Sequence, residues 1–201
     1  MVDIIVIRHG QSEADILNVM EGQADFNLTT LGLNQATLMA DWVNKYIEIN
    51  KIISSPLKRA KQTAEKLSAA TNIPVELDDC LMEWKNGLLA GLTREEADCK
   101  YPKSDKTFPH TAIYEQESMI DFRARAETAL SKIINENLPD SKIAVVSHGG
   151  MINMLFRSFI ESRANADISI SSGDTGIHHW RIEENSRRVV FVNSQIHLLQ
   201  M

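Results

Sequence analysis

The sequence predicts an α/β fold with three layers, in which a mostly parallel sheet lies between two layers of helices. Two observations lead to this class. Short apolar runs of strand length recur along the chain, as at residues 4–7 and 143–147, and amphipathic stretches of helical length separate them. An unbroken apolar run is typical of a strand buried on both faces, as in parallel sheets. Strands that alternate with helices favour the layered architecture.

The pattern of apolar residues also places the individual elements. Helices are expected over residues 30–47, 56–70, 119–138 and 150–160, and strands over 4–7, 51–54, 75–77, 143–147, 176–182 and 188–193. Ser55 and Pro56 fit a helix start, with serine as the N-cap and proline in the first turn. The helix over 30–47 is expected to bury one apolar stripe, formed by Ala36, Met39, Ala40, Val43 and Ile47.

Length and composition indicate a single globular domain over residues 1–201. The chain is 43% hydrophobic and 24% charged, without a repeat or a flexible linker. Its net charge of −6 argues against a nucleic-acid partner, and no apolar run approaches the roughly 20 residues of a membrane helix. Two cysteines, Cys80 and Cys99, are too few for a disulfide scaffold, so we expect free thiols and a cytoplasmic location.

Residues 98–118 interrupt the regular pattern. This stretch holds two prolines and many polar residues, and we expect it to form a loop or lid region. His110 is a weak candidate for touching substrate from such a lid, whereas Lys103 and Lys106 are more simply solvated charges. The remaining histidines, at 178, 179 and 197, are expected to be structural.

Charged or imidazole side chains follow three of the predicted strands. Arg8 and His9 end the first, Ser55 and Arg59 follow the second, and His148 follows the strand over 143–147. Parallel strands present their carboxyl ends at one edge of a sheet, where ligands bind. Guanidinium groups and helix N-termini both suit phosphate oxygens, and glycines such as Gly149 allow close backbone approach. The sequence therefore predicts a pocket for a phosphate group.

The same segments resemble the histidine phosphatase superfamily, also called the phosphoglycerate-mutase-like family. Four ordered stretches within residues 4–150 carry the resemblance: Arg8-His9-Gly10-Gln11-Ser12, the run from Ser54 through Arg59 to Ala64, Glu83-x-x-x-Gly87-x-x-x-Gly91-Leu92-Thr93, and Val146-Ser147-His148-Gly149-Gly150. A further stretch, Leu28-Thr29-x-x-Gly32-x-x-Gln35-Ala36, is similar to the helix that follows the family's first motif.

The resemblance implies a set of roles. His9 corresponds to the nucleophile that forms a phosphohistidine, Arg8 and Arg59 to the phosphate clamps, and His148 to a donor toward the phosphoryl oxygens. Glu83 corresponds to the general acid and base. We also expect Ser12, Gly149 and Gln23 to bind substrate; Glu21 and Asp25, near Gln23, are candidates for reading substrate hydroxyls. No metal and no other cofactor is expected.

Several positions depart from the family pattern. Asp15 stands where asparagine is common, and an ionised carboxylate there would repel phosphate unless it turns away or pairs with an arginine. Gln11 replaces a common glutamate, with little expected consequence. Asn86 and Leu89 replace aromatic residues, and Trp84 either compensates beside Glu83 or packs in the core.

The leading hypothesis is a metal-independent phosphatase that hydrolyses a small phosphorylated metabolite. A cofactor-dependent phosphoglycerate mutase is the alternative within the family, but such mutases carry a longer insertion than the compact step from Glu83 to His148. A non-catalytic binding or regulatory module is the alternative of a different class; it usually lacks the nucleophile or the acid, and both are present here. A sugar phosphate, a phosphoglycerate and a nucleotide-derived phosphate all remain open as substrates.

Overall fold

A six-stranded sheet forms the centre of the molecule in the computed structural model, which describes residues 1–102, 108–136, 140–163 and 166–200. The strand order is β3-β2-β4-β1-β5-β6. Strands β1 (Val2–Arg8), β2 (Lys51–Ser54), β3 (Val75–Leu77) and β4 (Ser141–Ser147) are parallel, whereas β5 (Ile177–Glu183) and β6 (Ser186–Ser194) form an antiparallel hairpin beside β1. The predicted mostly parallel sheet is confirmed.

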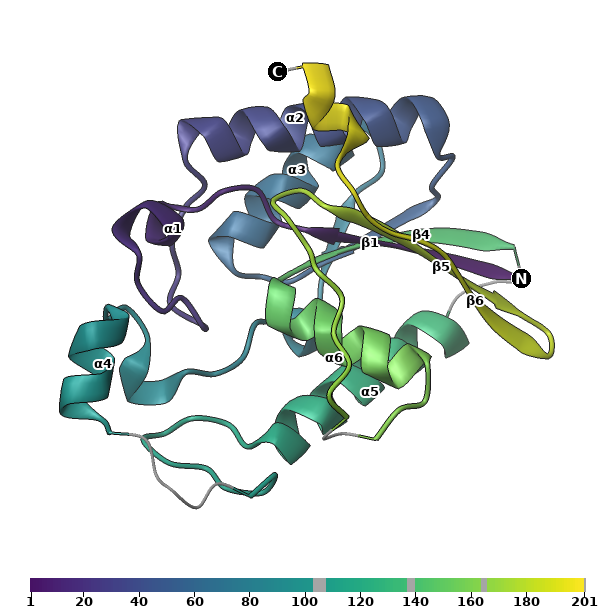
Figure 1. The fold of residues 1–201 in the computed structure, drawn as a ribbon. Helices are drawn as coiled ribbons and strands as arrows, with labels where there is room; N and C mark the ends of the chain where they lie inside the picture. The colour runs from purple at the N-terminus through teal and green to yellow at the C-terminus, as the bar shows by residue number, and fades with distance from the viewer. Residues whose placement is uncertain (103–107, 137–139, 164–165, 201) are drawn as a thin grey trace.

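Helices cover both faces of the sheet, as Figure 1 shows. One layer contains α2 (Thr30–Tyr46) and α3 (Lys58–Thr71), and the other contains α5 (Met119–Asn135) and α6 (Gly149–Phe159). Two short helices, α1 (Glu13–Leu17) and α4 (Arg94–Lys100), lie beyond the end of the sheet. Short 3-10 helices occupy Asp79–Leu81, Gly87–Leu89 and Ile196–Gln200.

Two hydrophobic clusters hold the layers together, one on each face of the sheet. The side chains of β1 alternate between them: Ile4 and Val6 pack with α5 and α6, while Ile5 and Ile7 pack with α2 and α3. All four are at most 1% exposed, as expected for a central strand buried on both faces. This packing fixes the end of β1, and therefore the position of the residues that follow it.

The structure corrects two expectations and adds one helix. Helix α3 begins at Lys58 with Leu57 as its N-cap, so Ser55 is not the cap. The Ser55 hydroxyl instead accepts a hydrogen bond from the Leu57 amide at 3.3 Å and contacts His148. Helix α1 was not anticipated. The region 98–118 is not wholly a loop, since α4 extends into it as far as Lys100.

Other expectations remain untested by the structure. Lys103 and Lys106 lie outside the described residues, and His110 is exposed, stacked on the ring of Phe108 with centroids 5.6 Å apart. The lid role of 98–118 and the single domain over 1–201 remain predictions. Among the described residues, no helix is both long and apolar enough to cross a bilayer.

Candidate active site

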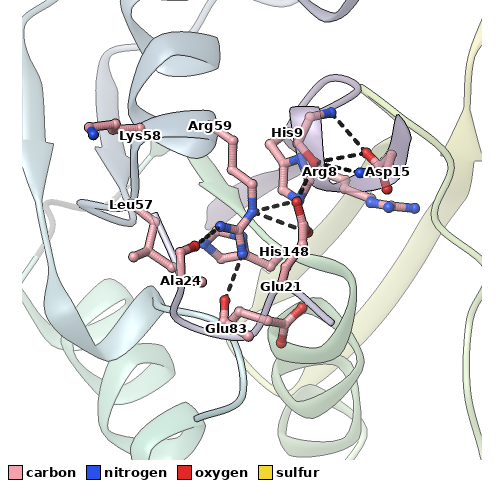
Figure 2. A network of polar contacts seen from close by, with 12 residues as sticks. Arg8, His9, Asp15, Glu21, Ala24, Leu57, Lys58, Arg59, Glu83 and His148 are labelled. Carbon is pink, nitrogen blue, oxygen red and sulfur yellow. Dashed lines mark hydrogen bonds and ion pairs between the residues drawn. The ribbon is translucent and has the colours of Figure 1, made fainter. Parts of the chain in front are cut away.

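The three predicted segments meet at one edge of the sheet. Strands β2, β4 and β1 are neighbours, and all three are parallel, so their carboxyl ends lie side by side. Arg8 ends β1 and is followed by His9, Arg59 lies in the first turn of α3 just beyond β2, and His148 lies between β4 and α6. Figure 2 shows these four side chains together. The convergence predicted from sequence is therefore present.

His9 is oriented by its own backbone. Its Nδ1 lies 2.8 Å from the carbonyl oxygen of Gly10, which can only accept, so Nδ1 carries the hydrogen and Nε2 keeps its lone pair. The side chain is 1% exposed. Burial lowers the pKa of His9 well below its ordinary value, the nearby charges of Arg59 and Arg8 lower it further, and only the Gly10 carbonyl opposes them. His9 is thus a neutral imidazole with a lone pair directed into the site.

His148 differs from His9 in the ring nitrogen that a neighbouring residue holds. Its Nε2 lies 2.8 Å from the hydroxyl of Ser55, and its ring centroid is 5.1 Å from that of His9. Burial lowers the pKa of His148 well below its usual value, followed by the charge of Arg59, so the ring is neutral. Ser55 accepts the Leu57 amide and can donate its proton to Nε2. This arrangement leaves Nδ1 protonated and free to donate.

Arg59 is fully buried, and its guanidinium group contacts both backbone carbonyls and side chains of the site. Its two terminal nitrogens donate to the carbonyls of Gly22 at 2.8 Å and Ala24 at 3.0 Å. Its Nε lies 3.3 Å from His9 Nε2 and 3.3 Å from Glu21 Oε2, as the dashed lines of Figure 2 show. Arg59 therefore binds the loop over 22–24 with its outer nitrogens and offers Nε at the nucleophile.

Arg8 is held by a loop far away in sequence. Its Nη1 donates to the carbonyl of Ser172 at 2.6 Å, and its Nη2 lies 3.7 Å from Asp174 Oδ1. Within the described part of the chain, Arg8 Nε and His148 Nδ1 are buried polar atoms that have no hydrogen-bond partner. Buried donors of this kind are costly unless a ligand satisfies them. Both belong to the site, where the oxygens of an anionic ligand would satisfy them.

Glu83 is fixed by two backbone amides. Its Oε1 accepts the Trp84 N–H at 2.7 Å, and its Oε2 accepts the Gly150 N–H at 2.9 Å. A Cβ at position 150 would overlap Glu83 Oε1, so the carboxyl keeps this place only while residue 150 is glycine. Gln23, expected to bind substrate, donates instead to the Glu83 carbonyl at 3.0 Å. Trp84 meets the buried Phe122 edge-on at 5.1 Å and so packs against the core.

A second support for Glu83 was not foreseen. Arg125 of α5 donates to the carbonyl of Cys80 at 3.1 Å, to that of Met82, and to that of Glu83 at 3.0 Å. Its charge is paired with Glu117 at 2.6 Å. Arg125 therefore organises the whole segment that carries Glu83, without reaching the nucleophile itself.

Ser12 and Asp15 form the start of α1. Ser12 is its N-cap, Ser12 N donates to Asp15 Oδ2 at 2.8 Å, and the Asp15 amide donates back to Ser12 Oγ at 3.3 Å. The Ser12 hydroxyl also contacts Asp15 Oδ2 at 3.1 Å and Glu21 Oε1. Asp15 thus turns to a capping box, one of the two ways in which its carboxylate was expected to avoid phosphate. Ser12 is used locally, whereas Glu21 reaches the nucleophile.

Comparison with known proteins agrees with this geometry. Residues 4–195 match the Histidine phosphatase superfamily (branch 1). The chain belongs to the histidine phosphatase superfamily. This confirms the family predicted from the four motifs.

Three relatives illustrate the range of the family. A glucosyl-3-phosphoglycerate phosphatase of Mycobacterium tuberculosis is 31% identical over 172 residues, covering 79% of this chain and 75% of that protein. A probable phosphoglycerate mutase of Proteus mirabilis is 33% identical over 173 residues, covering 83% and 79%. The structure of an Entamoeba histolytica phosphoserine phosphatase in complex with 3-phosphoglyceric acid superposes with a TM-score of 0.80 at 27% identity, covering 98% of this chain and all of that one.

Sequence reasoning missed the residues that hold the site together. Asp174 and Arg125 contact Arg8 and Glu83 from more than 40 positions away, and no local motif marks them. Burial raises the pKa of Asp174, against the opposing charge of Arg8. Gly149, expected to contact substrate, is the first residue of α6, immediately after His148. Among the described residues, no three His, Cys, Asp or Glu side chains are grouped as metal ligands.

Proposed function

We propose that the protein is a phosphatase that hydrolyses a small phosphomonoester through a phosphohistidine formed on His9. The observation that carries the proposal is the neutral His9 Nε2, which lies 3.3 Å from Arg59 Nε, at the same sheet edge as the unpartnered donors of Arg8 and His148. These groups form a cradle for a tetrahedral dianion directly at the nucleophilic lone pair. The phosphatase names among the relatives support hydrolysis as the reaction.

In the first step, the His9 Nε2 lone pair attacks phosphorus and the ester P–O bond breaks. The leaving alkoxide takes a proton from the Glu83 carboxylic acid and departs as the alcohol. The imidazole gains positive charge as the P–N bond forms, and the Gly10 carbonyl, which accepts from Nδ1, stabilises that charge. Arg8, Arg59 and His148 donate to the three phosphoryl oxygens as charge shifts onto them.

In the second step, water attacks the phosphorus of the phosphohistidine. The Glu83 carboxylate now accepts a proton from this water, the P–N bond breaks, and His9 returns to its neutral state with inorganic phosphate as product. Because the amides of Trp84 and Gly150 hold the carboxyl in one place, the same group is available in both steps.

A panel of phosphomonoesters tests the proposal, with released phosphate and isomerised product measured together. We expect phosphate release as the main outcome. A dominant transfer between two hydroxyls of a phosphoglycerate would instead favour a mutase, the function that the Proteus mirabilis relative's name supports. His9→Ala should abolish both turnover and acid-labile, base-stable labelling by a radioactive phosphoester. Labelling at His148 rather than His9 would reverse the assigned roles.

A further inference from the structure

Glu21 carries a partly buried carboxyl group at the nucleophile that the reaction described above does not use. Its side chain is 16% exposed, its Oε2 lies 3.8 Å from His9 Nε2, and it is visible between His9 and Glu83 in Figure 2. A phosphorus bonded to Nε2 carries its oxygens into the space beside Oε2. An ionised carboxylate there would face a phosphoryl dianion across a van der Waals contact, which is strongly repulsive in a buried site.

We propose that Glu21 acts as a neutral carboxylic acid in this site, and that the tetrahedral dianion binds only to the form of the protein in which Glu21 is protonated. The inference rests on the proposed function, since it places the phosphoryl group at His9. It adds a second, separate acid to Glu83, with the different task of removing a negative charge from the phosphate cradle.

The hydrogen bonds around Ser12 support a neutral Glu21. The Ser12 hydroxyl contacts two carboxyl oxygens, Asp15 Oδ2 at 3.1 Å and Glu21 Oε1, and it accepts the Asp15 amide. One hydroxyl proton cannot serve two ionised carboxylates. If Glu21 is protonated, it donates its own proton to Ser12, and the Ser12 proton is then free for Asp15.

The burial of Glu21 also favours its neutral form, against the net effect of the surrounding charges. Burial raises the pKa of Glu21, and the charge of Asp15 on α1 raises it further, whereas Arg59 on α3, the Ser12 hydrogen bond and Arg8 at the end of β1 lower it. His9 is neutral and adds no charge.

Glu21 also shares the positive charge of Arg59 with other carboxylates. Glu83, Asp15 and Asp25 interact with the same guanidinium. A bound dianion adds two further negative charges to this cluster, so its binding raises the pKa of Glu21 again and favours uptake of a proton.

Sulfate binding tests this directly, because inorganic sulfate is a tetrahedral dianion that does not itself titrate between pH 5 and 8. Its dissociation constant, measured from the sulfate-dependent rise in the thermal midpoint, should increase with pH once Glu21 ionises, by up to about tenfold per pH unit. Glu21→Gln keeps the shape of the neutral acid and should make sulfate binding independent of pH over that range. Glu21→Ala should do the same, and serves if the glutamine variant does not fold.

Asp15→Asn is the matched control. It makes the same carboxyl-to-amide change beside the same hydroxyl, and it should move the pH at which sulfate binding weakens while keeping the slope. A wild type whose sulfate affinity is flat from pH 5 to 8, or a Glu21→Gln variant that keeps the wild-type slope, would overturn the inference. A protein that binds sulfate in the expected way but hydrolyses no phosphomonoester would refute the proposed function alone.

Discussion

Replacing Gly150 by alanine should displace the Glu83 carboxyl group, and so impair its role as the acid, while leaving Glu83 itself unchanged. An added Cβ would overlap Glu83 Oε1 and lie 3.1 Å from its Cδ and 3.3 Å from its Oε2, so the carboxyl has to move by about 1 Å to reach an ordinary contact. The 2.9 Å hydrogen bond from the Gly150 amide to Oε2 is disturbed by the same movement. Alanine has a higher helix propensity than glycine, so the change does not disfavour α6.

The expected loss depends on the leaving group. A misplacement of about 1 Å can cost on the order of 10²-fold in rate, and complete loss of a general acid costs about 10²–10⁴-fold. Gly150→Ala should therefore lose on the order of 10²-fold in phosphoenzyme formation from an alkyl phosphate. Formation from p-nitrophenyl phosphate, whose leaving group is already a stable anion, should change little. Single-turnover burst kinetics are needed, because Glu83 is also proposed to act as base in the second step.

A double-mutant cycle decides whether the effect runs through Glu83. Glu83→Ala removes both the acid and the overlapping atoms, so Gly150→Ala should have almost no further effect in that background. Glu65→Gln, a change at an exposed carboxylate of α3, is the control for a general charge effect. Equal burst losses for both leaving groups, or a full loss from Gly150→Ala in the Glu83→Ala background, would refute the assignment of Glu83 as the acid.

Three further predictions follow from the same structure. Activity should survive EDTA, and a loss restored by Mg²⁺ or Zn²⁺ would contradict the metal-independent mechanism. Arg59→Lys should lower kcat/KM by at least about tenfold, because lysine cannot donate both to the loop carbonyls and at the nucleophile; near-normal kinetics would contradict this. Burial lowers the pKa values of His178 and His197 to about 4. As pH falls from 6.5 toward 4, these histidines therefore become protonated in the unfolded chain before they do so in the folded protein. The free energy of unfolding should decrease over this range, by up to about 1.4 kcal/mol per pH unit for each histidine. The raised pKa values of Glu21 and Asp174 act in the opposite sense. In urea unfolding between pH 7 and 5, the double variant His178→Gln/His197→Gln should show a free energy of unfolding that depends less steeply on pH than that of the wild type. An unchanged slope would contradict the prediction.

The central sheet was predictable because its signal is local. The run Ile4 to Ile7 needs no partner to be recognised as a strand buried on both faces, and β2 and β3 have the bounds expected from sequence. Helix α1 was missed for the opposite reason. It has only five residues, and its apolar Ile16 and Leu17 are exposed, so it has no buried stripe. Its start was nevertheless encoded in the capping box from Ser12 to Asp15.

The same division applies to the site. The groups proposed to meet phosphate stand at strand ends, and topology brings strand ends together, so their convergence could be predicted from sequence. The groups that position them lie on the far side of long loops: Asp174 reaches Arg8, and Arg125 reaches the Glu83 segment. Such contacts depend on tertiary packing, which no spacing rule contains. The prediction that Ser55 caps a helix was wrong for a related reason. Its hydroxyl contacts His148, a residue far away in the sequence, rather than capping the helix.

The anomalous Asp15 becomes intelligible once its neighbours are in view. A carboxylate near the phosphate cradle is unfavourable only if it faces the cradle, and Asp15 faces Ser12 and its own helix start. Its remaining effect is electrostatic and acts on Glu21, whose pKa its charge helps to raise. The negative charge at position 15 therefore favours a proton on the carboxyl group that does face His9. Two acidic residues that would each oppose phosphate binding alone are compatible with it as a pair under the proposal, because one turns away and its charge adds to the effect of burial in favouring a proton on the other.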